Sequence, residues 1–171
     1  MPITYYPEKK IFRLDSATAS YAMQVGPFGY LVHLYYGARI EDGEALDYLA
    51  YTVSHASFSP RVEMTERFSK DTARLEYAGH GCGDYRGSSL MVRTDNGSAA
   101  TDLRYVSHKI YGGKPTLPGR PATYATASEA TTLELLCRDD ATGVEVTLVY
   151  TVFEGNAAIT QIGRASCRER V

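Results

Sequence analysis

The sequence predicts an all-β protein, folded as an antiparallel β-sandwich with at most one short helix. Short apolar runs alternate with turn signals from Ile3 to Thr160, a pattern typical of antiparallel strands joined by tight connections. Fourteen Tyr and five Phe also favour strands, because aromatic side chains pack well on a pleated surface. The 171 residues, of which 44% are hydrophobic and 22% charged, are enough for one domain with a core.

The predicted strands are short segments that are rich in β-branched, aromatic and other apolar residues. They are Ile11–Leu14, Tyr21–Val25, Tyr30–Tyr36, Leu75–Tyr77, Leu90–Arg93, Leu103–Ile110, Leu133–Arg138 and Val144–Phe153. Between them, Gly, Asn and Asp supply positive φ angles and Pro supplies a fixed one, so these connections are predicted turns. Nothing resembles a linker or a repeat, and we therefore expect a single domain over residues 1–161.

The strongest hairpin signal joins Leu133–Arg138 to Val144–Phe153 through the sequence D-D-A-T-G at 139–143. One face of the second segment is apolar throughout, and the opposite face becomes apolar toward its end, with Val149 and Phe153. A strand that is apolar on both faces must be covered on both. We therefore expect further sequence to cover the second face, and we expect residues 1–161 without it to be poorly soluble or only partly folded.

One segment, Glu44–Val53, carries apolar residues at helical spacing and is the predicted short helix.

Composition argues against several classes of partner. A net charge of −2 without a basic stripe argues against binding to nucleic acid or to an anionic membrane. The N-terminal MPITYYPEKK lacks the apolar run of a signal peptide, and no stretch approaches the ~20 apolar residues of a membrane span. We expect a cytoplasmic protein.

Candidate chemistry is sparse. Cys82, Cys137 and Cys167 are odd in number and lack C-x-x-C spacing, so neither a disulfide framework nor a zinc site is indicated. His80 stands close to Cys82 but has no further ligand at useful spacing, so we expect no metal and no cofactor. No G-x-S-x-G sequence indicates a serine hydrolase.

Acidic residues offer many pairs for hydrolysis, but spacing alone selects none of them. Asp139-Asp140 and Glu41-Asp42 are predicted to be solvated turns. The densest cluster of Gly surrounds Asp84 and Arg86, in residues 76–89. Either this loop faces a substrate, or Asp84 and Arg86 form an internal pair that fixes an irregular loop; the sequence leaves both readings open.

Residues 162–171, IGRASCRERV, differ in character from the rest, with neither strand alternation nor a helical stripe. The string is similar to an in-frame translation of a common sequencing adapter. We therefore expect a tail that belongs to no domain, and a natural chain that continues differently after Gln161.

Several stretches, in order along the chain, carry a resemblance to the N-terminal domain of glycoside hydrolase family 36 α-galactosidases. They include SYAMQV, GYLVHLYYGARI, SFSP, GDYR, TDLRYVSHKIYGGKPTLPGRPATY and TGVEVTLVYTVFEGNAAIT. The resemblance covers nearly all of residues 1–161. It implies part of a large double β-sandwich, followed in the parent by a catalytic (β/α)₈ barrel that this chain lacks.

The implied parent reaction is retaining hydrolysis of terminal α-galactosides, such as melibiose and raffinose, without an organic cofactor. The implied parent is a homo-oligomer, and its catalytic residues lie in the barrel. For this chain we therefore expect no catalytic residue and no activity. The expected substrate contacts are His55, which lies three residues before Phe58 where relatives often have an aspartate, together with Arg67, Asp84 and Arg86.

A different class of function is compatible with the same composition: a stand-alone carbohydrate-binding β-sandwich. Such modules present aromatic rings for stacking on sugars, often Trp, and this chain has none. The unusual tail favours the fragment, because a genuine module would end at its own stop codon. A role in oligomer contacts is compatible with the fragment as well.

Overall fold

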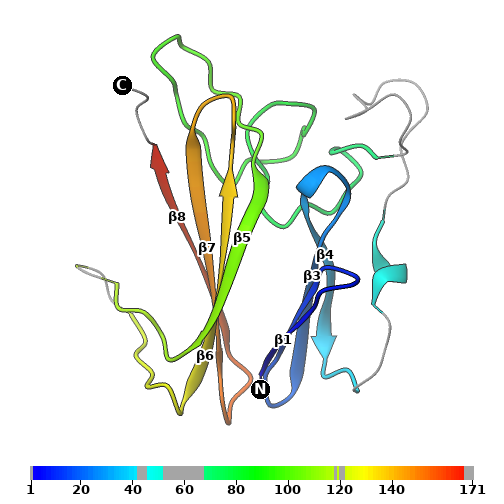
Figure 1. Ribbon diagram of the computed structural model, residues 1–171, viewed down its shortest axis with the longest axis vertical. Helices are drawn as coiled ribbons and strands as arrows, with labels where there is room; N and C mark the ends of the chain where they lie inside the picture. Colours follow the sequence, from blue (N-terminus) through cyan, green and yellow to red (C-terminus); the bar gives the residue numbers. More distant parts are fainter. Residues whose placement is uncertain (1, 42–45, 52–67, 118, 120–121, 168–171) are drawn as a thin grey trace.

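The computed structural model describes residues 2–41, 46–51, 68–117, 119 and 122–167, which form two four-stranded antiparallel sheets (Figure 1). In each sheet the strands follow chain order. The first sheet contains β1 (Ile3–Tyr6), β2 (Ile11–Asp15), β3 (Ala19–Val25) and β4 (Leu31–Ala38). The second contains β5 (Arg104–Gly112), β6 (Ala130–Arg138), β7 (Val144–Phe153) and β8 (Ile159–Cys167). The predicted all-β, antiparallel fold is confirmed.

A single core joins the two sheets. Phe12, Leu14 and Met23 of the first sheet belong to the same buried cluster as Leu135 and Leu148 of the second. Because successive side chains of a strand point to opposite faces, alternate residues such as Phe12 and Leu14 of β2, and Val146 and Leu148 of β7, reach this core. Toward one end the sheets diverge, and residues 68–103, drawn in green, lie there (Figure 1).

The predicted hairpin is confirmed as β6 and β7. Leu135 pairs with Leu148, so the apolar faces of both strands point to the core together. The connection closes because Gly143 takes a φ of 72°, which glycine adopts without steric cost. Asp139 accepts hydrogen bonds from the backbone N–H groups of Ala141 and Thr142, at 2.9 and 3.4 Å, and so supports the turn.

The second face of β7 is less covered than its core face. Leu148 and Val152 are fully buried, whereas Val149 and Phe153 on the other face are only half-buried. This difference agrees with the alternation in the sequence. That sequence beyond this chain covers the second face stays a prediction.

Three predicted elements differ from the structure. Within Glu44–Val53 the described residues 46–51 form one 3₁₀ turn, η2 (Asp47–Leu49), instead of the predicted helix. Leu46 and Leu49 pack on the outer face of the first sheet, and a segment this short cannot sustain an isolated α-helix. Leu75–Tyr77 makes only an isolated bridge from Leu75 to Val32, and Leu90–Arg93 belongs to no strand among the described residues.

Two strands were missed by the sequence analysis. β1 was not predicted, and β8 continues through residues 162–167, where no strand was expected. β8 pairs along the whole of β7, from Ile159 with Val152 to Cys167 with Val144. A strand at the edge of a sheet is held by backbone hydrogen bonds, so it forms without an alternating sequence. The origin of residues 162–171 stays a prediction.

Two buried charged groups stabilise the first sheet and its junction with the second. Arg13 of β2 is 1% exposed and pairs with Asp15, while its Nη2 donates to the Ile40 carbonyl at 2.7 Å. Glu76, whose side chain is 4% exposed, accepts hydrogen bonds from the phenols of Tyr21 in β3 and Tyr150 in β7. Glu76 therefore connects the two sheets.

These buried phenols predict loss of stability in alkali. Burial, and then the adjacent Glu76 carboxylate, raise the pKa of Tyr21 and of Tyr150 well above the ordinary value near 10. Below pH ~10 the phenol is protonated in both the folded and the unfolded chain, so its hydrogen bond to Glu76 stabilises the folded chain fully. As pH rises above ~10 only the unfolded state ionises, and the free energy of unfolding falls by about 1.4 kcal/mol per pH unit for Tyr150.

Urea unfolding of the unsubstituted 171-residue chain between pH 9 and 11.5 measures this slope. We expect Tyr150→Phe to have a shallower slope than the unsubstituted chain. Tyr124→Phe, a change at a ring that is 75% exposed, serves as the control and should keep the slope of the unsubstituted chain. Equal slopes for both variants would contradict the prediction.

Within the described part of the chain, no helix has the length and apolar character needed to cross a membrane.

Candidate functional site

The Gly-rich loop forms a tight turn against the first sheet. Gly81, Cys82 and Gly83 have φ angles of 72°, 54° and 85°, and the Asp84 N–H donates to the Gly81 carbonyl at 3.2 Å. The two central residues, Cys82 and Gly83, both have positive φ, as in a type I′ turn, and this favours glycine at position 83. At Gly79 the backbone passes so close to Thr101 that a Cβ atom would lie 2.3 Å from its carbonyl oxygen.

Asp84 and Arg86 form an internal pair in this loop. The Asp84 side chain is 2% exposed, and its Oδ1 accepts from the Arg86 backbone N–H at 3.1 Å and from its Nε at 2.9 Å. The guanidinium also donates to the carbonyls of Ala73 and Lys70, at 2.7 and 2.9 Å. These contacts anchor the loop to the segment that precedes it, and they support the internal-pair reading of these residues.

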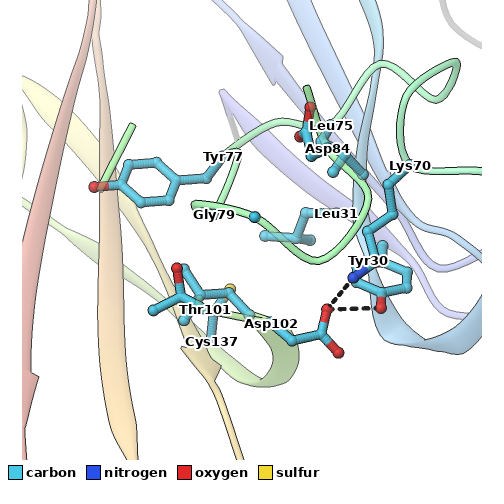
Figure 2. Close-up of a pocket in the computed structure, with 12 residues that line it drawn as sticks. Tyr30, Leu31, Lys70, Leu75, Tyr77, Gly79, Asp84, Thr101, Asp102 and Cys137 are labelled. Atoms are coloured by element: carbon cyan, nitrogen blue, oxygen red, sulfur yellow. Dashed lines mark hydrogen bonds and ion pairs between the residues drawn. The ribbon is translucent and has the colours of Figure 1, made fainter. Parts of the chain in front are cut away.

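A second polar network lies beside the loop and joins three segments (Figure 2). Asp102 Oδ1 accepts from the phenol of Tyr30, at 2.8 Å, and from the ammonium of Lys70. Asp102 Oδ2 accepts from Arg104 Nε at 3.2 Å. The Lys70 and Arg104 cations lie 5.0 and 5.2 Å from the centre of the Tyr30 ring, within cation–π range.

The electrostatics keep this network charged. Burial by itself would lower the pKa of Lys70, but hydrogen bonds to Asp102 and Tyr30 outweigh burial, so the pKa is raised. Burial would likewise raise the pKa of Asp102, and the hydrogen bonds from Lys70 and Tyr30 reverse that effect, so the pKa is lowered. Both groups remain ionised near neutral pH, which suits an ion pair and not a proton-transfer step.

The cavity between the network and the loop is too small for a sugar. Tyr77, Gly79, Thr101 and Cys137 are among the residues that line it (Figure 2), and its volume is about 20 Å³. One water molecule fills a space of this size, whereas ligand pockets usually enclose ~300 Å³ or more. This small cavity is therefore not a glycoside pocket. A more open hollow of about 550 Å³ shares Asp102 with it and is also lined by Cys82 and Asp139.

The predicted site residues separate into two groups. His55 and Arg67 lie outside the described residues, and their predicted substrate contacts stay predictions. Asp84 and Arg86 lie together as described above. In the described ranges, no group of three or more His, Cys, Asp or Glu side chains could hold a metal ion, and Asp139 is engaged in its turn.

No sequence pattern indicated Tyr30, Lys70, Asp102 and Glu76, which make several of the polar contacts in this region. Tyr30 and Asp102 are separated by 72 positions, and Glu76 and Tyr150 by 74. No local pattern connects residues so far apart in the chain. A Glu within the apolar run of a predicted strand, Leu75–Tyr77, was the one available signal.

The family model and the sequence relatives that match this chain all belong to α-galactosidases or their N-terminal domain. The Glycosyl hydrolase family 36 N-terminal domain matches residues 29–168. "Alpha-galactosidase AgaA" of Geobacillus stearothermophilus is 42% identical over 96% of this chain and 22% of its own length. The "Bifunctional alpha-galactosidase/sucrose kinase AgaSK" of Mediterraneibacter gnavus is also 42% identical, over 94% of this chain and 17% of its own length.

Solved structures agree with the sequence relatives. The crystal structure of the GH36 α-galactosidase AgaB from Geobacillus stearothermophilus superposes with a TM-score of 0.89 at 41% identity, covering 98% of this chain and 22% of that one. The chain thus spans about a fifth of the length of these relatives. With the same two-sheet fold and a family match over most of its length, the chain belongs to the Glycosyl hydrolase family 36 N-terminal domain family.

Proposed function

We propose that this chain is the non-catalytic N-terminal part of a retaining α-galactosidase that hydrolyses terminal α-galactosides of the melibiose and raffinose type. The carrying observation is the family match over residues 29–168 in a chain that spans only 22% of the α-galactosidase AgaA. The parent is proposed to be a cytoplasmic homo-oligomer that needs no organic cofactor.

The geometry of the described residues supports a structural role in that enzyme. Asp84, Asp102 and Asp139 each accept hydrogen bonds from neighbouring groups of the chain, so each of them holds nearby segments in place. The Asp84–Arg86 pair sets the position of its loop, and any effect of this pair on substrate binding would act through that position. The smaller of the two cavities beside the loop holds no more than a water molecule.

An activity assay with a matched chimera tests the proposal. We expect the purified chain to hydrolyse no chromogenic α-galactoside. We expect AgaA to keep measurable turnover when its matching N-terminal region is replaced by residues 2–161 of this chain, because the sandwich supplies the same surface to the rest of the enzyme. An unrelated β-sandwich in the same position is the control and should abolish turnover.

Two results would contradict the proposal. One is turnover by the chain alone that survives repurification. The other is a chimera that is folded, as judged by circular dichroism, and yet as inactive as the control. Sequencing the gene across the Gln161 codon adds an independent check, since a stop codon within a few positions would leave no room for a barrel.

A stand-alone carbohydrate-binding module remains the second candidate because several tyrosine rings are exposed. Tyr48, Tyr85 and Tyr124 are 73%, 77% and 75% exposed, and exposed rings can stack on sugars. Calorimetric titration of the chain with raffinose distinguishes the two functions. A module would bind the sugar by itself, whereas the N-terminal part of an enzyme is expected to show no heat of binding.

A further inference from the structure

The two sheets have four edge strands, and three of these are protected against pairing with another chain. β1 is only four residues long and has a proline on either side. β4 is already occupied in part, because its His33 N–H donates to the Arg74 carbonyl at 2.7 Å. β5 has a register shift next to Tyr105 and carries the exposed charges of Arg104 and Lys109. Short strands, proline, bulges and charged side chains are the features that keep sheet edges from pairing.

The fourth edge, β8, has almost none of these features. It is nine residues long and pairs with β7 without a register shift, from Ile159 opposite Val152 to Cys167 opposite Val144. It contains neither proline nor lysine, and Arg164 is its one charged residue. Figure 1 shows β8 at the outer edge of the second sheet. Among the described residues, no backbone group of β8 hydrogen-bonds outside its own sheet, so a row of N–H and C=O groups faces away from β7.

An apolar row crosses the second face of this sheet and reaches the β8 edge. Ile162 lies directly opposite Val149 of β7, so both side chains are on that face, and both are half-buried. An antiparallel partner strand would extend the row if it placed another apolar residue opposite Ile162. Cross-strand apolar pairs stabilise a sheet, whereas like charges directly opposite each other destabilise it.

A second copy of β8 satisfies both conditions. In a two-fold antiparallel pair centred on Ile162, the Ile162 side chains of the two copies lie opposite each other. Arg164 then lies opposite Thr160 of the other copy, so the two guanidinium groups occupy different positions. On the opposite face the same register sets Gly163 against Gln161, which brings no two charges together. β8 is therefore complementary to itself.

We propose that two copies of this chain dimerise by pairing β8 with β8, centred on Ile162, so that their second sheets form one continuous eight-stranded sheet. The contact uses the same strand of both copies, so it closes on itself and assembly stops at the dimer. The three protected edges leave no further strand for growth. This contact belongs to the chain itself and does not depend on the proposed enzymatic role.

Analytical ultracentrifugation of the 171-residue chain over a concentration series, with a reducing agent present, tests the dimer. We expect an equilibrium between monomer and dimer. Ile162→Lys sets two ammonium groups opposite each other and should raise the dissociation constant of the dimer about tenfold or more. Val106→Lys is the matched control, since Val106 is 47% exposed on β5, at the other edge of the sheet, and the same change there should leave the dissociation constant unaltered.

A charge placed at Thr160 tests the register. In Thr160→Glu each new carboxylate lies opposite Arg164 of the other copy, so we expect the dissociation constant of the dimer to fall about fivefold. Adding Arg164→Ser to Thr160→Glu should remove that gain. Thr160→Glu keeps the proposal testable if circular dichroism shows that Ile162→Lys fails to fold, because it strengthens the contact instead of breaking it.

Hydrogen exchange at a low and a high protein concentration locates the contact. We expect β8 to exchange more slowly at the high concentration and β5 to exchange equally at both. A chain that is monomeric at every concentration, or that forms species larger than the dimer, would overturn the proposal. So would a dimer with the same dissociation constant in Ile162→Lys and Val106→Lys, or a dimer that Thr160→Glu does not strengthen.

Discussion

Replacing Arg13 with alanine is expected to lower the free energy of unfolding by about 3–5 kcal/mol, the usual cost of removing one partner from a buried ion pair. Arg13 is 1% exposed, and its Nε lies 2.8 Å from Asp15 Oδ2. Its two terminal nitrogens donate to the carbonyls of Glu41 and Ile40, at 3.2 and 2.7 Å. The substitution therefore leaves the buried Asp15 carboxylate with only its hydrogen bond from Ser20, and deprives two backbone carbonyls of their Arg13 donors.

Urea unfolding monitored by circular dichroism measures the loss. Arg138→Ala is the matched control, because Arg138 also pairs with a carboxylate, Glu145, but its side chain is 42% exposed. An exposed pair contributes little to stability, so the control should unfold close to the parent midpoint. If Arg13→Ala were no less stable than Arg138→Ala, the buried pair would not support the first sheet as described.

Alanine substitutions at two neighbouring positions of β7 are expected to lower the free energy of unfolding by very different amounts. Leu148 is fully buried in the core, and Leu148→Ala should cost about 2–5 kcal/mol, since it removes apolar contacts and leaves a cavity. Val149 is on the opposite face and only half-buried, so Val149→Ala should cost under about 1 kcal/mol. Thermal and urea unfolding of the two variants checks the contrast.

The same pair of variants reports on what covers the second face of the sheet. If Val149→Ala costs as much as Leu148→Ala, the second face is buried in solution, and unfolding measured at two protein concentrations shows whether another copy of the chain covers it. Equal costs that do not change with concentration would contradict the faces assigned by the structure. Val149→Thr, which keeps the shape and adds a hydroxyl, should be tolerated on an open face and is the control.

The sequence by itself predicted the elements that depend on local chemistry. The hairpin of β6 and β7 was predictable because alternation along Leu133–Arg138 and Val144–Phe153 specifies one apolar face and 139–143 has turn residues. The glycine residues around Cys82 indicated an irregular loop, although not whether Asp84 and Arg86 turn inward. The family was predictable as well, because ordered short matches do not depend on the fold.

The tertiary structure decided what depends on distant partners. β8 forms beside β7 although residues 162–167 do not alternate, because β7 offers a row of free backbone groups. Leu90–Arg93 has the apolar composition of a strand and yet belongs to no strand among the described residues. Glu76 became a buried link between two sheets only when Tyr21 and Tyr150 were brought to it. Burial and hydrogen bonding in a sandwich join residues many positions apart, and no local pattern records such contacts.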